Sequence, residues 1–292
     1  MSKLYLIDGT FELFRAYCAV PSSTGPNGNE VGAIRGLLSS TLVLLRESAP
    51  LYVAAATDHI IESFRNRLFA GYKTGDGIAP DLWAQFPLAE EAFEALGIVV
   101  WPMIEFEADD AIATAAARFA AAADQVVILS PDKDLAQCVD GRRVVLHDRI
   151  RRVTYDEAAV RARFGVPPSG IPDYLALVGD RADGFPGLPG WGAKSAAALV
   201  AAYGSIDAIP DDPRAWSIPT LRGRERLAAT LAAQRRDAQL YKTLATLRRD
   251  VPLTEQLEDL RWRGVPRRRY EAFCQRLGLR DLVNRPTQWA TE

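Results

Sequence analysis

Histidine and cysteine are scarce in this chain, which has two histidines and three cysteines among 292 residues. Two histidines are too few for a histidine-rich zinc site. Because Cys18, Cys138 and Cys274 are odd in number and far apart, we expect neither a disulfide framework nor a thiolate metal site, and we expect a reducing compartment. A Gly-x-x-x-x-Gly-Lys loop is also missing, which argues against an ATPase.

Long apolar runs are missing as well. No segment approaches the roughly 20 residues of a membrane span. The start, Met1-Ser2-Lys3, leads directly into a short apolar run, so we expect no signal peptide. Hydrophobic residues make up 48% of the chain and charged residues 25%, which is typical of a globular protein with a full core. These features predict a cytoplasmic protein without a membrane partner.

The net charge of -2 conceals an asymmetry between the two ends of the chain. Residues 1–183 contain 17 basic and 25 acidic residues, whereas residues 184–292 contain 18 and 12. An acidic part that binds metal and a basic part would suit one polyanionic ligand. Solvated surface charge is the alternative explanation of the same numbers.

Short apolar runs alternate with helical patterns in the first part of the chain. The runs that indicate buried strands are 4–7, 51–57, 126–130 and 144–148, with a fifth at 98–101. The helical patterns are 31–47, 87–96 and 108–122, and a capping box, Thr154-x-x-Glu157, predicts a further helix that ends at about residue 164. The alternation predicts an α/β domain over residues 1–170, with a mostly parallel sheet flanked by helices.

Residues after 171 have helical patterns throughout. These patterns are 172–179, 192–203, 220–236, 237–247 and 267–276, with glycine and proline between them. We therefore expect an all-α region over residues 171–292, packed on the sheet. Residues 74–80 are rich in turn-forming residues, which predicts a mobile loop.

Nine acidic residues are placed where a folded chain would gather them. Most follow an apolar run directly, and ligands of parallel sheets bind outside the carboxyl ends of the strands. The nine candidates are Asp8, Asp58, Glu107, Asp109, Asp110, Asp132, Asp134, Asp180 and Asp183. Single acids at helix N-termini are common caps, but capping does not explain several acids at each junction. Because packed carboxylates repel one another, the set predicts bound cations.

The ligand chemistry indicates which cations and which reaction. Carboxylate oxygens without histidine or cysteine favour Mg²⁺ or Mn²⁺. Two such ions about 4 Å apart activate water and stabilise the leaving oxygen of an in-line displacement. The acid set therefore predicts phosphodiester hydrolysis.

A glycine-rich segment precedes the helix predicted near residue 193. Gly187, Gly190 and Gly192 would let backbone N–H groups approach a phosphate, and Lys194 would add a positive charge. This pattern predicts a helix–hairpin–helix over about residues 175–203 that binds a DNA backbone without reading its sequence. The alternative is a tight connection between two helices.

Three further residues are candidates for substrate contacts. Arg65 and Lys73 follow the second predicted strand, and we expect them to contact the scissile phosphate. Tyr17 is expected to stack on a base. Taken singly, each of the three is as readily explained as an ordinary surface or core residue.

Together these residues resemble the 5′-nuclease superfamily, which includes the 5′→3′ exonuclease domain of bacterial DNA polymerase I and the flap endonucleases. The resemblance spans about residues 4 to 280. The matching motifs are Leu6-Ile7-Asp8-Gly9, Phe14-Arg15-Ala16-Tyr17, Asp58 with Ser63-Phe64-Arg65, Gly71-Tyr72-Lys73, Glu107-Ala108-Asp109-Asp110, Asp132-Lys133-Asp134-Leu135, Gly179-Asp180-x-x-Asp183, Pro186-Gly187-x-x-Gly190-x-Gly192-x-Lys194 and the segment from Leu244 to Leu253.

The resemblance implies a PIN-like, resolvase-like sheet and two metal sites. It assigns one ion to Asp8, Asp58, Glu107 and Asp109 or Asp110, and the other to Asp132, Asp134, Asp180 and Asp183. It assigns phosphate contacts to Lys73 and Arg65, duplex binding to the hairpin, with a K⁺ ion there, and an arch to about residues 64–96. No polymerase motif follows, which predicts a stand-alone nuclease.

The chain also departs from the superfamily pattern. Residues 74–96 contain no lysine or arginine, which argues against steering of a single strand through the arch, and we expect flap activity to be weak or differently tuned. The usual Asp-Asn pair is Asp183-Gly184 here, and Trp191 stands where a smaller aliphatic residue is usual.

The sequence predicts a Mg²⁺-dependent, structure-specific 5′→3′ exonuclease or flap endonuclease of DNA replication and repair. Its expected partners are DNA 5′ ends, flaps or nicks, including RNA-primed strands, and we expect a monomer associated with a bacterial nucleoid. Two alternatives remain: an RNase with a PIN-type domain, and a DNA-binding module without catalytic activity.

Overall fold

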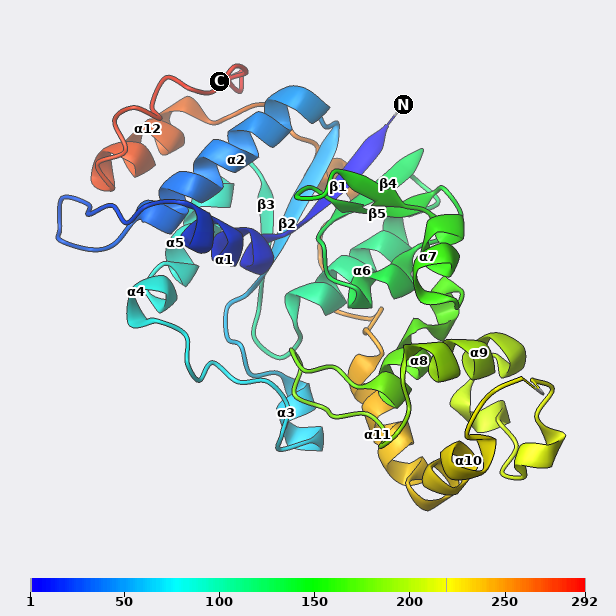
Figure 1. Ribbon diagram of the computed structural model, residues 1–292. Coiled ribbons are helices and arrows are strands. Elements are labelled where there is room, and N and C mark those ends of the chain that lie inside the picture. The colour runs from blue at the N-terminus through cyan, green and yellow to red at the C-terminus, as the bar shows by residue number, and fades with distance from the viewer. Residues whose placement is uncertain (1, 219, 292) are drawn as a thin grey trace. The chain divides into compact units, whose positions relative to one another are not determined.

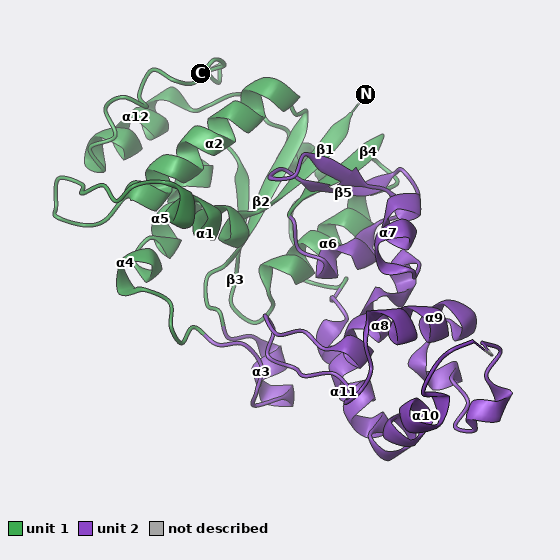
Figure 2. Ribbon diagram, viewed as in Figure 1, with its two compact units in different colours: residues 1–61, 75–130, 249–292 green, residues 62–74, 131–248 purple. Residues whose placement is uncertain are grey.

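The computed structural model describes residues 2–218 and 220–291. Figure 1 shows the chain coloured by residue number. The chain divides into two compact units, each built from separate stretches of sequence. Unit 1 comprises residues 1–61, 75–130 and 249–292, and unit 2 comprises residues 62–74 and 131–248 (Figure 2). Each unit contains residues from both sides of position 170, and the predicted division there remains a prediction.

Unit 1 contains four parallel strands in the order β3-β2-β1-β4. Their bounds are β1 Lys3–Asp8, β2 Tyr52–Asp58, β3 Val99–Met103 and β4 Gln125–Leu129. In the register of the sheet, Asp8 lies opposite Ala56, and Ile7 lies opposite Leu129. The first six residues of β2 are buried, as expected for a parallel strand covered on both faces.

The helices of unit 1 pack around this sheet. Their bounds are α1 Gly9–Ala19, α2 Gly32–Ser48, α4 Pro80–Trp83, α5 Phe86–Ala95, α6 Ala108–Phe119 and α12 Arg267–Arg276, with a 3₁₀ turn, η5, at Leu257–Leu260. Helices α1, α2 and α5 pack against one another, whereas α6 contacts all four strands (Figure 1). Asp8 begins α1 as its N-cap, because its Oδ1 accepts a hydrogen bond from the Phe11 N–H at 2.9 Å.

Unit 2 is mainly helical. Its α-helices are α3 Phe64–Leu68, α7 Glu157–Phe164, α8 Ile171–Val178, α9 Ala193–Tyr203, α10 Arg224–Ala233 and α11 Arg235–Ala245. Its strands are β5 Val144–Asp148 and β6 Val153–Tyr155. Its 3₁₀ turns are η1 Asp134–Cys138, η2 Pro168–Gly170, η3 Ile206–Ala208 and η4 Pro213–Ala215. Strands β5 and β6 form an antiparallel pair. Helix α8 packs on η1, α9 and α11, so η1 is held against the helical core.

The predicted fold class, a mostly parallel sheet flanked by helices with a helical C-terminal region, is confirmed. The predicted capping box is wrong, because Thr154 belongs to β6 and Asp156 caps α7 by accepting a hydrogen bond from Ala159 N–H at 2.9 Å. Within the C-terminal region, the described residues after 249 join unit 1 and contain η5 and α12. No helix in residues 2–218 and 220–291 is both long and apolar enough to span a bilayer.

Candidate active site

Asp8 and Asp58 end two neighbouring parallel strands of unit 1, at the edge where the sequence predicts a ligand. Asp8 is buried, and its Oδ2 accepts a hydrogen bond from the Ser130 hydroxyl at 2.8 Å. Asp58 Oδ1 accepts a hydrogen bond from the Ala108 N–H at 2.8 Å, which links the end of β2 to the first turn of α6. The sheet edge therefore holds both carboxylates in fixed positions.

The remaining predicted acids of unit 1 lie in that first turn of α6. Glu107 is the N-cap residue and Asp110 forms a reciprocal capping box with it, since Asp110 Oδ2 accepts from the Glu107 N–H at 3.0 Å. Both side chains are buried, whereas Asp109 is half-buried. The structure thus brings Asp58 to the helix end that carries the other three acids.

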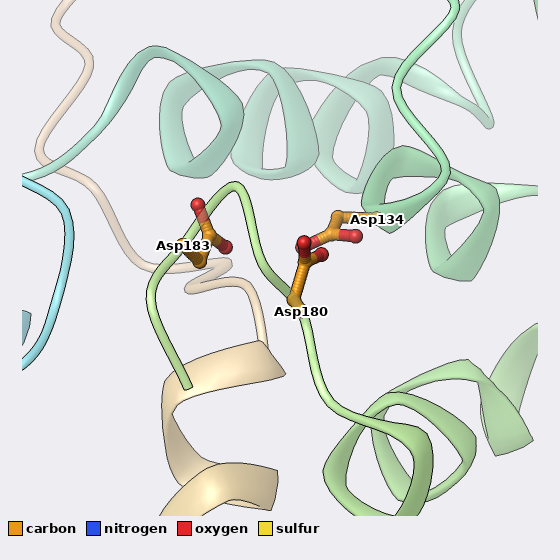
Figure 3. A group of neighbouring side chains, drawn as sticks. All are labelled: Asp134, Asp180 and Asp183. Atoms are coloured by element: carbon orange, nitrogen blue, oxygen red, sulfur yellow. The ribbon is translucent and has the colours of Figure 1, made fainter. Parts of the chain in front are cut away.

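Three acids of unit 2 converge more closely. One carboxylate oxygen from each of Asp134, Asp180 and Asp183 lies within 4.8 Å of the others (Figure 3). Asp134 comes from η1, and the other two come from a turn closed by mutual backbone hydrogen bonds between Asp180 and Phe185. All three residues are buried, Asp134 and Asp180 to 5% residual exposure. Among the described residues this is the one group of three or more acids that meets a metal-ligand geometry.

The electrostatics of this group are unfavourable without a cation. Burial, and then the charges of Asp132 and Asp183, raise the pKa of Asp134 well above the usual range of an aspartate. Asp134 Oδ1 is buried and has no hydrogen-bond partner among the described residues. Because a buried carboxylate oxygen without a hydrogen bond is costly, the site fits an oxygen-binding divalent ion.

Two lysines of unit 2 contact the same group. Lys133 Nζ donates a hydrogen bond to Asp180 and lies 3.6 Å from Asp134 Oδ1. Burial lowers the pKa of Lys133, but the carboxylates of Asp134 and Asp180 outweigh burial and raise it overall. Lys73 Nζ lies 3.1 Å from Asp183 Oδ1, so the structure brings this predicted catalytic residue to a predicted metal ligand.

Asp132, the fourth acid assigned to this ion, lies outside the group. Its side chain is exposed, and its Oδ1 accepts a hydrogen bond from the Asp134 N–H at 2.9 Å. Its charge contributes to the raised pKa of Asp134. Asp132 therefore stabilises the turn before η1 and adds negative charge near Asp134, and its role as a metal ligand stays a prediction.

The departure at Gly184 has a backbone explanation. Gly184 has φ +85°, and a Cβ there would overlap the carbonyl oxygen of Gly71. The Lys73 N–H donates to the carbonyl of Asp183 at 3.1 Å, so the two chain segments lie against each other at this point. A left-handed residue without a side chain allows this approach, which positions Lys73 beside Asp183.

Arg65 and Tyr17 are engaged within the protein. Arg65 is 1% exposed, and its guanidinium donates to the carbonyls of Leu244 at 2.8 Å and Thr246 at 3.1 Å. Its predicted contact with the scissile phosphate stays a prediction, and the contacts observed are structural. Tyr17 donates from its hydroxyl to the carboxylate of Asp81 at 3.0 Å, and this hydrogen bond raises the pKa of Tyr17. Its ring remains half-exposed, and base stacking also stays a prediction.

The predicted hairpin connects α8 to α9. Gly187 is buried with φ +70° and packs against the backbone at the end of α8, where the Leu188 N–H donates to Leu177 O at 2.9 Å. Gly190, Gly192 and Lys194 are exposed, and Gly192 is the N-cap of α9. The exposed residues stand at the N-terminus of an 11-residue helix, a position that favours anions.

Trp191 is accommodated inside the hairpin. It is buried and packs against Trp216, with ring centroids 6.5 Å apart. The larger side chain therefore adds to the core of unit 2 and does not project from the hairpin.

Sequence reasoning did not assign roles to Lys133 and Ser130. The signal for Lys133 was present, because a basic residue stands between two acids of a metal-binding type of motif. Ser130 directly follows a buried strand, but its hydrogen bond to Asp8 depends on the pairing of β4 with β1. Strand pairing cannot be read from one segment alone.

Two family models together match residues 3–268 of this chain. A family model described as the 5′-3′ exonuclease N-terminal resolvase-like domain matches residues 3–165. The model of the 5′-3′ exonuclease C-terminal SAM fold matches residues 166–268. Together the two models cover all nine predicted metal-binding acids and the hairpin.

Individual proteins show the same likeness. A 5′-3′ exonuclease of Aquifex aeolicus is 36% identical over 210 residues, which cover 72% of each chain. DNA polymerase I of Mycobacterium leprae is 35% identical over 245 residues, or 81% of this chain, but the match spans only 26% of that polymerase. The bacteriophage T5 D15 flap endonuclease, solved as a pseudo-enzyme–product complex with DNA and metal ions, shares the fold with a TM-score of 0.64 and 19% identity, covering 83% of this chain and 88% of that one.

Proposed function

The chain belongs to the 5′-3′ exonuclease family, and on that premise we propose that it is a structure-specific 5′-nuclease that hydrolyses DNA phosphodiesters with divalent metal. The observation that carries the proposal is the buried group of Asp134, Asp180 and Asp183, with one carboxylate oxygen left without a hydrogen-bond partner among the described residues. A buried arrangement of this kind is costly unless a cation joins it. The exonuclease of Aquifex aeolicus supports the reaction class.

The proposed metal ligands come in two sets. The unit-2 set is Asp134, Asp180 and Asp183, with Asp132 next to them in the turn, and the unit-1 set is Asp8, Asp58, Glu107, Asp109 and Asp110. When bound, Mg²⁺ or Mn²⁺ supplies a water of lowered pKa and positive charge at the leaving oxygen. Each set would take one ion, and the oxygen-only donors of both favour these metals over zinc.

The proposed role of the protein's own cations is to offset charge on the reacting phosphate. Lys73 is held beside Asp183 by its ammonium and by its backbone N–H, so its position is fixed before substrate arrives. A preorganised ammonium stabilises a developing negative charge better than a mobile one. Arg65 donates to the carbonyls of Leu244 and Thr246, so we propose that it holds α3 in place, and its contact with the phosphate stays a prediction.

The hairpin is the proposed DNA contact. Exposed Gly190 and Gly192 leave backbone N–H groups accessible at the start of α9, and Lys194 adds a charge. Such contacts grip a phosphate backbone without reading bases. A K⁺ ion bound by hairpin carbonyls is part of this proposal.

The proposed substrates are DNA 5′ ends, flaps and nicks, including RNA-primed strands, cut by a monomer at the bacterial nucleoid in the cytoplasm. The proposed arch comprises about residues 64–96, and α5, at its C-terminal end, packs against α1, α2 and α12 within unit 1. The rest of the segment from residue 74 to α5 carries Asp76 and Asp81 but no basic residue, so we propose weak threading of single strands.

Product mapping on a 5′-labelled DNA flap tests the proposal. We expect short 5′-labelled products with Mg²⁺, none with EDTA, and no cleavage of single-stranded RNA of the same sequence. Cleavage of the RNA but not of the flap would favour a PIN-type RNase. Flap binding with no cleavage in Mg²⁺ or Mn²⁺ would favour a non-catalytic DNA-binding module.

A further inference from the structure

We propose that Lys133 is a resident counter-ion of the unit-2 acid group and that a divalent ion must displace its ammonium, so that Lys133 limits how tightly the group holds metal. The inference rests on the proposed function in one respect, that Asp134, Asp180 and Asp183 take a divalent ion. It adds a residue that weakens metal binding, whereas the acids strengthen it.

The contacts of Lys133 place its charge inside the group. Its Nζ donates a hydrogen bond to Asp180 Oδ2 and lies 3.6 Å from Asp134 Oδ1. These two carboxylates belong to the set whose ligand atoms lie within 4.8 Å of one another. An ammonium and a divalent ion cannot both contact the same carboxylate oxygens at full strength, because the two positive charges repel each other at this range.

The ammonium satisfies the group only in part. Asp134 Oδ1 is buried and has no hydrogen-bond partner among the described residues, although Lys133 is its neighbour. A single positive charge therefore reduces the repulsion between the carboxylates but leaves a ligand oxygen available. A divalent ion, with twice the charge and a preference for several oxygens, would complete what the lysine begins.

Lys133 also has a route out of the group. Its side chain is 35% exposed, whereas those of Asp134 and Asp180 are 7% and 5% exposed. A lysine has a long, flexible stem, so its ammonium can leave the carboxylates for solvent without movement of the backbone. The acids stay in place while the cation is exchanged.

Lys133 differs in this respect from the other lysine at the group. Lys73 Nζ lies 3.1 Å from Asp183 Oδ1, and its backbone N–H donates to the carbonyl of the same residue. Lys133 instead spans two acids, so its charge opposes a metal ion more directly. Removal of the Lys133 charge is therefore expected to tighten metal binding.

Calorimetric titration of Mn²⁺ into the full chain tests the inference. The binding site of interest is the one at which Asp180→Asn abolishes Mn²⁺ binding. We expect Lys133→Met to bind Mn²⁺ at this site about tenfold more tightly than the wild type, or better. Lys133→Gln removes the charge but keeps a hydrogen-bond donor, and it should change the affinity in the same direction if Lys133→Met folds poorly without metal.

Lys242→Met is the matched control. Lys242 belongs to the same unit, and its Nζ lies 2.9 Å from Oδ1 of buried Asp173 and 3.3 Å from Oδ2 of Asp207, neither of which belongs to the group. Its loss should lower the thermal midpoint of unfolding and leave Mn²⁺ affinity unchanged. Unchanged or weaker Mn²⁺ binding in both Lys133 variants would overturn the inference while leaving the proposed nuclease intact. A wild type without any ion that depends on Asp180 would overturn the metal site itself.

Discussion

Replacing Asp134 with asparagine should make the metal-free protein more stable at neutral pH and remove its response to divalent ions at the same site. Burial and the charges of Asp132 and Asp183 raise the pKa of Asp134 above its ordinary value of 3.8. At pH values between 3.8 and the folded pKa, the metal-free folded protein therefore holds this proton to a greater extent than the unfolded chain does. The asparagine side chain would be uncharged at all pH values, and its amide N–H groups would find carboxylate acceptors nearby.

The sign of the pH dependence follows from proton binding. Below pH 3.8 both states are protonated, and the stability from this group is fully present. As the pH rises from there to the folded pKa, the folded state binds more protons, so stability falls by up to about 1.4 kcal/mol per pH unit. The asparagine variant lacks this loss, and we expect it to gain about 1 to 3 kcal/mol at pH 7.5 in EDTA.

Urea denaturation in EDTA at pH 5 and pH 7.5, repeated with saturating Mg²⁺, measures both effects. The wild type should gain about 2.7 kcal/mol from an ion at a hundred times its dissociation constant, and Asp134→Asn should lack this gain at the unit-2 site. Asp156→Asn serves as the control, since it alters a helix cap of the same unit and no metal ligand. A variant with wild-type pH dependence and wild-type Mg²⁺ stabilisation would refute the reasoning.

Three further predictions concern Gly184, Lys73 and Lys194. Gly184→Ala should lower the free energy of unfolding by about 2 to 4 kcal/mol, because φ is +85° and a Cβ would overlap Gly71. The control Gly204→Ala, at φ +81° with open space around it, should lower the free energy of unfolding by about 1 kcal/mol. Equal urea midpoints for the two variants would contradict this. Lys73→Ala should reduce kcat on a flap substrate about a hundredfold with little change in the Kd for DNA, and a loss confined to Kd would contradict a role in the reaction. Lys194→Ala should weaken DNA binding and lower the slope of log K against log salt by about 1, and an unchanged slope in fluorescence anisotropy would remove Lys194 from the interface.

The strands were predictable because burial on both faces leaves a continuous apolar run. The run at 51–57 became β2, Tyr52–Asp58, with a shift of one residue. Three helices were missed: α1 starts directly after β1 at Gly9, and α3 and α4 are only five and four residues long. Short helices of this kind depend on tertiary contacts more than on local pattern. β6 was missed for the same reason, since its three residues form a strand only beside β5.

The candidate site was predictable in its residue types but not in its groupings. Asp8 and Asp58 lie at strand ends because the carboxyl ends of parallel strands share one edge. The meeting of Asp134 with Asp180 depends instead on how η1 packs against α8, and no local pattern encodes that distance. The burial of Arg65 could not be predicted either. Its motif resembles one that contacts phosphate, but its hydrogen bond to the Leu244 carbonyl depends on tertiary packing.

The central claim is that the buried group of Asp134, Asp180 and Asp183 is a divalent metal site. Anomalous diffraction from crystals soaked in Mn²⁺ tests it most directly. We predict a Mn²⁺ peak about 2.1 to 2.2 Å from oxygens of at least two of these three aspartates, and no such peak in Asp180→Asn crystals. A fully occupied Mn²⁺ elsewhere in the molecule, with Lys133 and Lys73 still in contact with this group, would contradict the claim.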